Sequence, residues 1–118
     1  MKYYLLEPFA KDLSIKKNPP LSDKGIRMAR IFALTMKGIS IDYCYTNTSV
    51  ASFGTALLLV GDKIIVNKVD ALDKELEENV TSFIDELNNK YKEGKILIIA
   101  EKSVLSIINK YTDAVFIS

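Results

Sequence analysis

The sequence predicts an α/β domain, a three-layer α/β/α sandwich around a mostly parallel sheet of about five strands. Short apolar segments rich in Ile, Val and Tyr alternate with longer amphipathic segments along the chain. Repeated strand and helix indicate βαβ units, which place helices on both faces of a parallel sheet. The 118 residues suffice for one core. No linker or repeat divides them, so we expect a single domain over residues 1–118.

Five segments have the length and composition of strands. The fourth is apolar from Ile96 to Ala100, which is typical of a strand covered on both faces. The predicted strands are residues 3–6, 39–45, 63–66, 96–100 and 114–117.

Four helices are predicted between these strands. The first begins at the N-cap Ser22 and ends at Gly38, a residue able to adopt a left-handed C-cap. The second covers about residues 49–60, and the fourth about residues 103–111. The third is indicated by apolar residues spaced by three or four, which form one stripe. That stripe comprises Leu72, Leu76, Val80, Phe83, Leu87 and Tyr91.

Composition excludes several classes of function. The chain has 16 basic and 15 acidic residues, which gives a net charge of +1, and neither sign forms a block of five. This balance predicts no nucleic-acid partner and no membrane anchor, since both need clustered positive charge. The single cysteine, Cys44, lies in an apolar run typical of a buried thiol. With no run long enough to span a bilayer, we expect a cytoplasmic protein.

The chain contains no histidine. This excludes an imidazole nucleophile, a Ser-His or Cys-His pair and a histidine-based metal site. There is also no glycine-rich phosphate loop, so no cofactor is expected.

Ligands of parallel α/β sheets bind at the carboxyl ends of the strands. The loops that follow three predicted strands are therefore the expected functional edge. They are residues 7–10, 46–49 and 101–103.

Three motifs follow one another in a recognisable order. They are Pro-Leu-Ser-Asp-Lys-Gly at residues 20–25, Tyr-Thr-Asn at 45–47 and Thr-Ala at 55–56. This order resembles the histidine phosphatase superfamily, which has the phosphoglycerate mutase-like fold, and most closely its short phosphohistidine phosphatases. The resemblance covers most of the chain.

The resemblance also implies where the family's phosphoryl-transfer groups would lie. Where the family has an arginine, its nucleophilic histidine and a glycine, this chain has Glu7, Pro8 and Phe9. Ala51 stands in the place of the second arginine, and Glu101 in that of the second histidine. Proline has no side-chain nucleophile, and two carboxylates repel a phosphate. The degenerate pocket positions are thus Glu7, Pro8, Phe9, Ala51, Glu101 and Lys102.

These substitutions predict a catalytically inactive histidine phosphatase-like domain. Such a domain acts as a binding, regulatory or assembly module, with an unidentified protein partner or by self-association. The competing interpretation is that Phe9 fills the former pocket and that the domain has no such role.

An enzyme hypothesis stands beside it. Glu7 and Glu101 at neighbouring strand ends would act as an acid and base pair, or hold a divalent cation, in a divergent phosphatase or other hydrolase. The alternative is that each carboxylate is solvated or pairs with Lys11 or Lys102. Two carboxylates are too few to specify a metal.

A third hypothesis keeps a phosphate ligand without turnover. Asn47, Thr48 and Ser49 precede the second helix, whose N-terminus would attract an anion. The alternative is ordinary N-capping by the same residues.

Overall fold

The computed structural model describes residues 1–117. The strands are β1 (Lys2–Leu6), β2 (Tyr43–Thr46), β3 (Val66–Lys68), β4 (Lys95–Ile99) and β5 (Ala114–Phe116). The helices are α1 (Asp23–Met36), α2 (Val50–Val60), α3 (Glu77–Lys90) and α4 (Lys102–Tyr111), with a short 3-10 helix, η1 (Asp70–Leu72).

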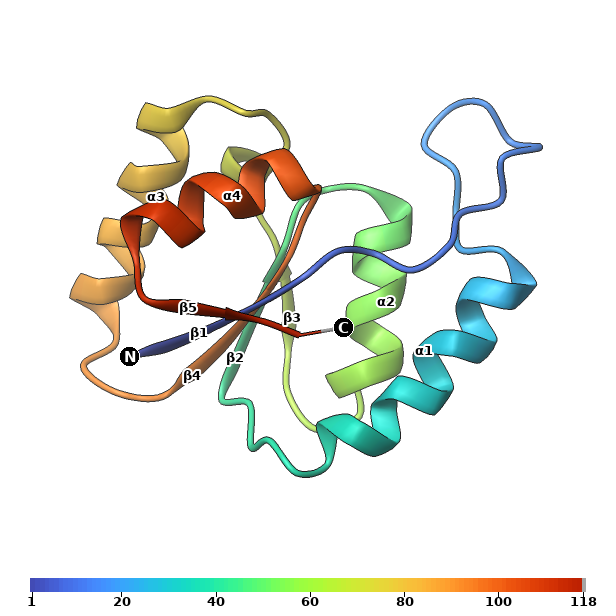
Figure 1. Ribbon diagram of the computed structural model, residues 1–118, viewed down its shortest axis with the longest axis horizontal. Helices are drawn as coiled ribbons and strands as arrows, with labels where there is room; N and C mark the ends of the chain where they lie inside the picture. The colour runs from blue at the N-terminus through green and yellow to red at the C-terminus, as the bar shows by residue number, and fades with distance from the viewer. Residues whose placement is uncertain (118) are drawn as a thin grey trace.

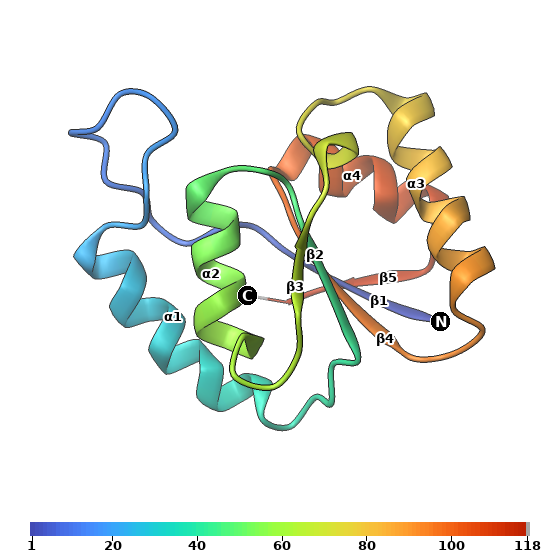
Figure 2. The ribbon, with the colours of Figure 1, turned by 180° about the vertical axis from the view of Figure 1, so that it is seen from behind.

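The five strands form a parallel sheet in the order β3-β2-β4-β1-β5. Helices α1 and α2 cover one face, and α3 and α4 cover the other, as the two views in Figures 1 and 2 show. The predicted three-layer architecture is therefore confirmed.

Strand β4 lies at the centre of the sheet and separates two cores. Ile96 and Ile98 pack into the cluster beneath α3 and α4. Leu97 and Ile99, which alternate with them, pack into the cluster beneath α1 and α2. Because successive side chains point to opposite faces, a strand buried on both sides has to be apolar throughout.

Two strands differ from their predicted bounds by more than one residue at an end. Strand β2 begins at Tyr43 and not at residue 39, because the amides of Ile39 and Ile41 are bonded within the turn that ends α1. Strand β3 begins at Val66, since the amides of residues 63 and 64 donate to the Val60 carbonyl and continue the turn after α2. In both cases tight turns override β propensity.

Two helices also differ. Helix α1 begins after the N-cap Ser22 as predicted, but Gly38 is not left-handed; the helix ends in tight turns, with the Gly38 amide donating to the Thr35 carbonyl. Helix α3 begins only at Glu77, because Leu72 belongs to the separate η1 and Leu76 is the half-exposed N-cap.

A close backbone approach explains Gly25 in the first motif. A Cβ at this position would overlap the carbonyl oxygen of Ala10. The same oxygen accepts hydrogen bonds from the amide (2.9 Å) and the hydroxyl (3.1 Å) of Ser22. The start of α1 is thereby held against the segment that leaves β1.

Cys44 is buried in β2 as predicted, and this burial raises the pKa of its thiol to about 12. The thiol is therefore protonated at neutral pH, which removes its nucleophilic form. No helix within residues 1–117 is long and apolar enough to cross a bilayer.

Candidate functional site

The three loops of the expected functional edge converge. Leu6 at the end of β1 and Thr46 at the end of β2 both pair with Ile99 at the end of β4. The segments that begin at Glu7, Asn47 and Ala100 therefore leave the sheet side by side.

The segment Glu7–Phe9 is attached to α2 and to the core. The Phe9 amide donates to the Thr55 hydroxyl at 3.3 Å, and that hydroxyl donates to the Ala51 carbonyl at 2.8 Å. The Phe9 ring meets Phe32 edge-on, 5.7 Å between centroids, and packs against the cluster beneath α1 and α2. Phe9 is thus partly buried against the core, while Glu7 is exposed.

Glu101 is the N-cap residue of α4 and has a cationic partner. The Lys11 ammonium donates to its Oε1 at 2.7 Å. This pair, half exposed, is worth about 0.2–1 kcal/mol. Glu7 takes part in no ion pair within residues 1–117, and Lys102 is exposed in the first turn of α4. Of the two glutamates, only Glu101 forms an ion pair with a lysine within residues 1–117.

The turn from Asn47 to Ser49 caps α2. The Ser49 hydroxyl accepts from the Ser52 amide at 3.1 Å, and Asn47 Oδ1 accepts from the Ser49 amide and hydroxyl. The amide and hydroxyl of Thr48 both donate to Asp73 at 2.7 Å.

One more amide donor at the N-terminus of α2 is bonded to a residue that is distant in sequence. The Val50 amide donates to Asn18 Oδ1 at 3.0 Å. The donors that the sequence offers to an anion are therefore largely bonded to oxygen atoms of the chain itself. Asp73 supplies the negative charge that a helix N-terminus favours.

Buried polar side chains gather at this corner of the molecule. Within the described residues, those with almost no exposure are Thr46, Asn47, Ser52 and Thr55. Only the hydroxyl of Ser52 has no hydrogen-bond partner there. A buried group without a partner costs about 1–3 kcal/mol, so the corner retains polarity at some expense of stability.

Two contacts at this edge escaped the sequence-based reasoning. Asn18 lies 32 residues before Val50, and Asp73 lies 25 residues after Thr48. The pairing of Lys11 with Glu101 was one of the alternatives weighed from the sequence, and it is confirmed although 90 residues separate the two. No local pattern signals pairs at such separations, because only the folded sheet brings the strand ends together.

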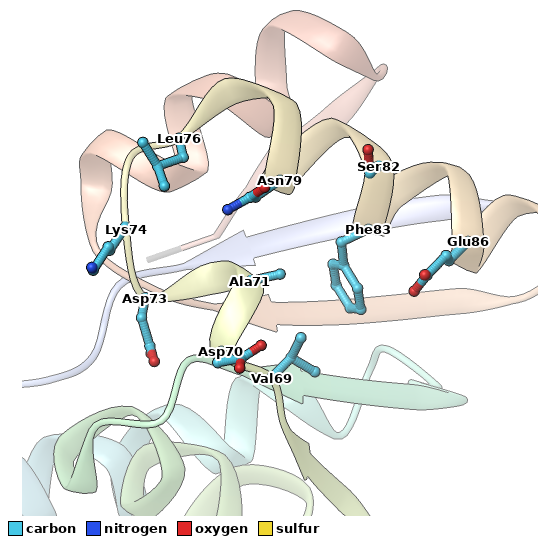
Figure 3. Close-up of a pocket in the computed structure, with 10 residues that line it drawn as sticks. All are labelled: Val69, Asp70, Ala71, Asp73, Lys74, Leu76, Asn79, Ser82, Phe83 and Glu86. Carbon is cyan, nitrogen blue, oxygen red and sulfur yellow. The ribbon is translucent and has the colours of Figure 1, made fainter.

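Four cavities formed by the described residues lie away from the positions that the resemblance singled out. None of the four is lined by any of these six positions. A cavity of about 700 Å³ opens beside the same edge, between the end of β3 and α3, and is shown in Figure 3. No group of three metal-binding side chains occurs within residues 1–117.

The sequence matches no known family profile and no curated protein. The structure, in contrast, is similar to several solved ones. The α-ribazole phosphatase of Shigella flexneri superposes with a TM-score of 0.82 at 16% identity, over 94% of this chain and 79% of that one.

Two further structures agree with it. The phosphoglycerate mutase of Bacillus anthracis has a TM-score of 0.81 at 12% identity, covering 94% of this chain and 79% of its own. The protein histidine phosphatase SixA, solved with tungstate, has 0.78 at 17% identity, covering 92% and 74%. The chain has the phosphoglycerate mutase-like fold, as its resemblance implied.

Proposed function

We propose that this protein is a catalytically inactive histidine phosphatase-like domain that serves as a binding or assembly module. The observation that carries the proposal is the side-chain inventory of the carboxyl edge. The chain has no histidine, and its arginines, Arg27 and Arg30, both belong to α1 and not to the strand ends. Neither the nucleophile nor the cationic cradle of phosphoryl transfer is present there.

Electrostatics support the same conclusion. A phosphoryl transition state needs donors and positive charge that are free to receive it. At this edge Lys11 is engaged by Glu101, and the Thr48 amide is engaged by Asp73. An incoming phosphate would have to displace a carboxylate in either place.

Because the similar solved structures include phosphatases, a phosphate ester and a phosphoramidate are the substrates to test. We expect the purified protein to hydrolyse neither p-nitrophenyl phosphate nor a phosphohistidine peptide above the buffer rate. An active phosphatase of the same fold serves as the positive control.

Turnover that is lost in Glu101→Gln would establish the divergent hydrolase instead. Turnover that survives this substitution would also overturn the proposal, and would locate the chemistry elsewhere. The variant Glu93→Gln, at an exposed position outside this edge, controls for the loss of one carboxylate.

Phosphate binding without turnover has its own test. Titration with inorganic phosphate, followed by the amide resonances of Asn47 to Ser49, is expected to leave them unshifted, because their donors are bonded internally. A saturable shift at these amides would establish an anion site.

We further propose a cytoplasmic location. The proposal is based on Cys44, which is buried and free, because free thiols are typical of a reducing compartment.

A further inference from the structure

A short exposed loop follows β1 and carries positive charge. It comprises residues 13–17, Leu-Ser-Ile-Lys-Lys, and is named here the basic loop. Leu13 is 82% exposed and Ile15 is 45% exposed. Lys16 and Lys17 are also exposed, and neither forms an ion pair within residues 1–117. The loop thus presents two exposed apolar side chains beside two unpaired lysines.

The basic loop is held in place at both ends. The amide and hydroxyl of Ser14 donate to Asp12 Oδ1 at 3.1 and 2.6 Å. The Asp12 amide donates to the Pro20 carbonyl, and Asn18 reaches the start of α2. A braced loop loses little conformational entropy when it binds, which favours association.

The cavity of about 700 Å³ beside the same edge has the opposite charge. Asp70, Asp73 and Glu86 line it against one lysine, Lys74, for a net charge of −2. None of these groups forms an ion pair within the described chain. This hollow is named here the acidic cavity.

The acidic cavity also has an apolar interior. Figure 3 shows the Phe83 ring pointing from α3 toward Val69 across the hollow, with Ala71 beside it. Leu76 at its rim is half exposed. Its chemistry is therefore suited to an apolar side chain followed by positive charge, which is the sequence of the basic loop.

The two features flank the N-terminus of α2. Asn18, next to the basic loop, bonds to the Val50 amide, and Asp73 of the acidic cavity bonds to the Thr48 amide. Figures 1 and 2 show both segments at the same edge of the molecule, the loop before α1 on one side and the segment before α3 on the other. A two-fold axis through this edge would place each loop over the cavity of the other copy.

We propose that the carboxyl edge is a self-complementary interface, at which the basic loop of one copy enters the acidic cavity of a second copy and receives the other's loop in return. The inference rests on the proposed function, since it names a second copy of the chain as the partner of that module. The net charges, +2 on residues 13–17 and −2 around the cavity, balance in each of the two contacts.

Sedimentation equilibrium over a wide range of protein concentration tests this. We expect a monomer and dimer in equilibrium, with the dimer weakened by salt because screened charges contribute to it. The double variant Lys16→Glu/Lys17→Glu is expected to be monomeric at concentrations where the wild type is dimeric. The variant Asp70→Lys/Glu86→Lys is expected to be monomeric as well, and it spares Asp73, which accepts both hydrogen bonds from Thr48.

Mixing the two monomeric variants is the decisive step. In a mixed dimer, the acidic loop of the Lys16→Glu/Lys17→Glu chain meets the basic cavity of the Asp70→Lys/Glu86→Lys chain. The unchanged basic loop of the second chain meets the unchanged acidic cavity of the first. Both contacts therefore join opposite charges again. We expect a heterodimer of near wild-type stability. The control variant Lys92→Glu/Lys110→Glu changes the charge equally at exposed positions outside the edge, and it should dimerise normally.

A wild type that remains monomeric overturns the inference. So does a dimer that is unaffected by the loop and cavity variants, or a mixture that fails to associate. A monomer that binds vesicles of anionic lipid through Lys16 and Lys17 would assign the loop to a membrane surface and also overturn it. None of these results restores phosphatase activity, so the proposed function stands or falls separately, on turnover.

Discussion

Strand β4 and the corner where β2 passes into α2 are both buried, yet different interactions stabilise them. In β4 every side chain from Ile96 to Ile99 is apolar and fully buried. At the corner, Asn47 and Ser52 are equally buried but polar. An apolar side chain is stabilised wherever it leaves water, whereas a polar one needs a partner in the right direction. Burial by itself therefore says little about the stability of a site.

The largest expected effect is at β4. Ile98→Ala would leave a cavity in the cluster beneath α3 and α4, and we expect it to lower the free energy of unfolding by about 2–5 kcal/mol. Urea denaturation followed by circular dichroism measures this. Ile65→Ala, at a position 80% exposed, removes the same atoms and should change stability by no more than about 0.5 kcal/mol. Equal effects at both positions would contradict the assignment of β4 to the core.

The next effect tests how the edge is attached to α1. In Gly25→Ala the new methyl group overlaps the Ala10 carbonyl, so we expect a loss of about 1–3 kcal/mol. The same substitution at Gly54 meets nothing closer than Leu21 Cδ1 at 3.7 Å. There we expect a gain of about 0.5–1 kcal/mol, since alanine favours a helix. Thermal unfolding of the two variants should shift in opposite directions, and a Gly25→Ala protein as stable as the wild type would contradict this packing.

A smaller effect tests the polar corner through its remote partner. Asp73→Ala removes both bonds from Thr48, and we expect a loss of about 1 kcal/mol, comparable to that of a helix cap. Asp70→Ala, three residues earlier, removes an exposed carboxylate that caps nothing and is expected to be nearly neutral. Denaturation midpoints of the two variants decide the matter; equal midpoints would show that Asp73 does not stabilise α2.

The smallest effect has the opposite sign. Ser52→Ala removes a buried hydroxyl that has no partner within the described residues, and we expect a gain of about 0.5–1 kcal/mol. Ser49→Ala, in the same turn, removes the acceptor of the Ser52 amide and should cost about 1 kcal/mol. Calorimetry of the two variants measures both changes in stability. A loss of stability in Ser52→Ala would mean that this hydroxyl has a hydrogen-bond partner after all.

What the sequence predicted, and what it did not, also differs between the apolar strands and the polar corner. The apolar runs and the cap at Ser22 predicted all five strands and the starts of α1 and α2, because these signals lie within a few residues of one another. The strand bounds at residues 39–42 and 63–65 were wrong where a turn competes with β-branched side chains. The converging loops were predicted, but the partners of Thr48, Val50 and Glu101 were only partly foreseen.

By itself, the sequence determined that this chain is an α/β sheet protein without an imidazole, since periodicity and the absence of a residue type are both properties of the linear chain. Only the tertiary structure decided where the charges lie. A net charge of +1 with no charged block conceals a basic loop and an acidic cavity on either side of α2. Their residues, from the loop after β1 and from the segments after β3, meet at one edge because parallel strands end there together.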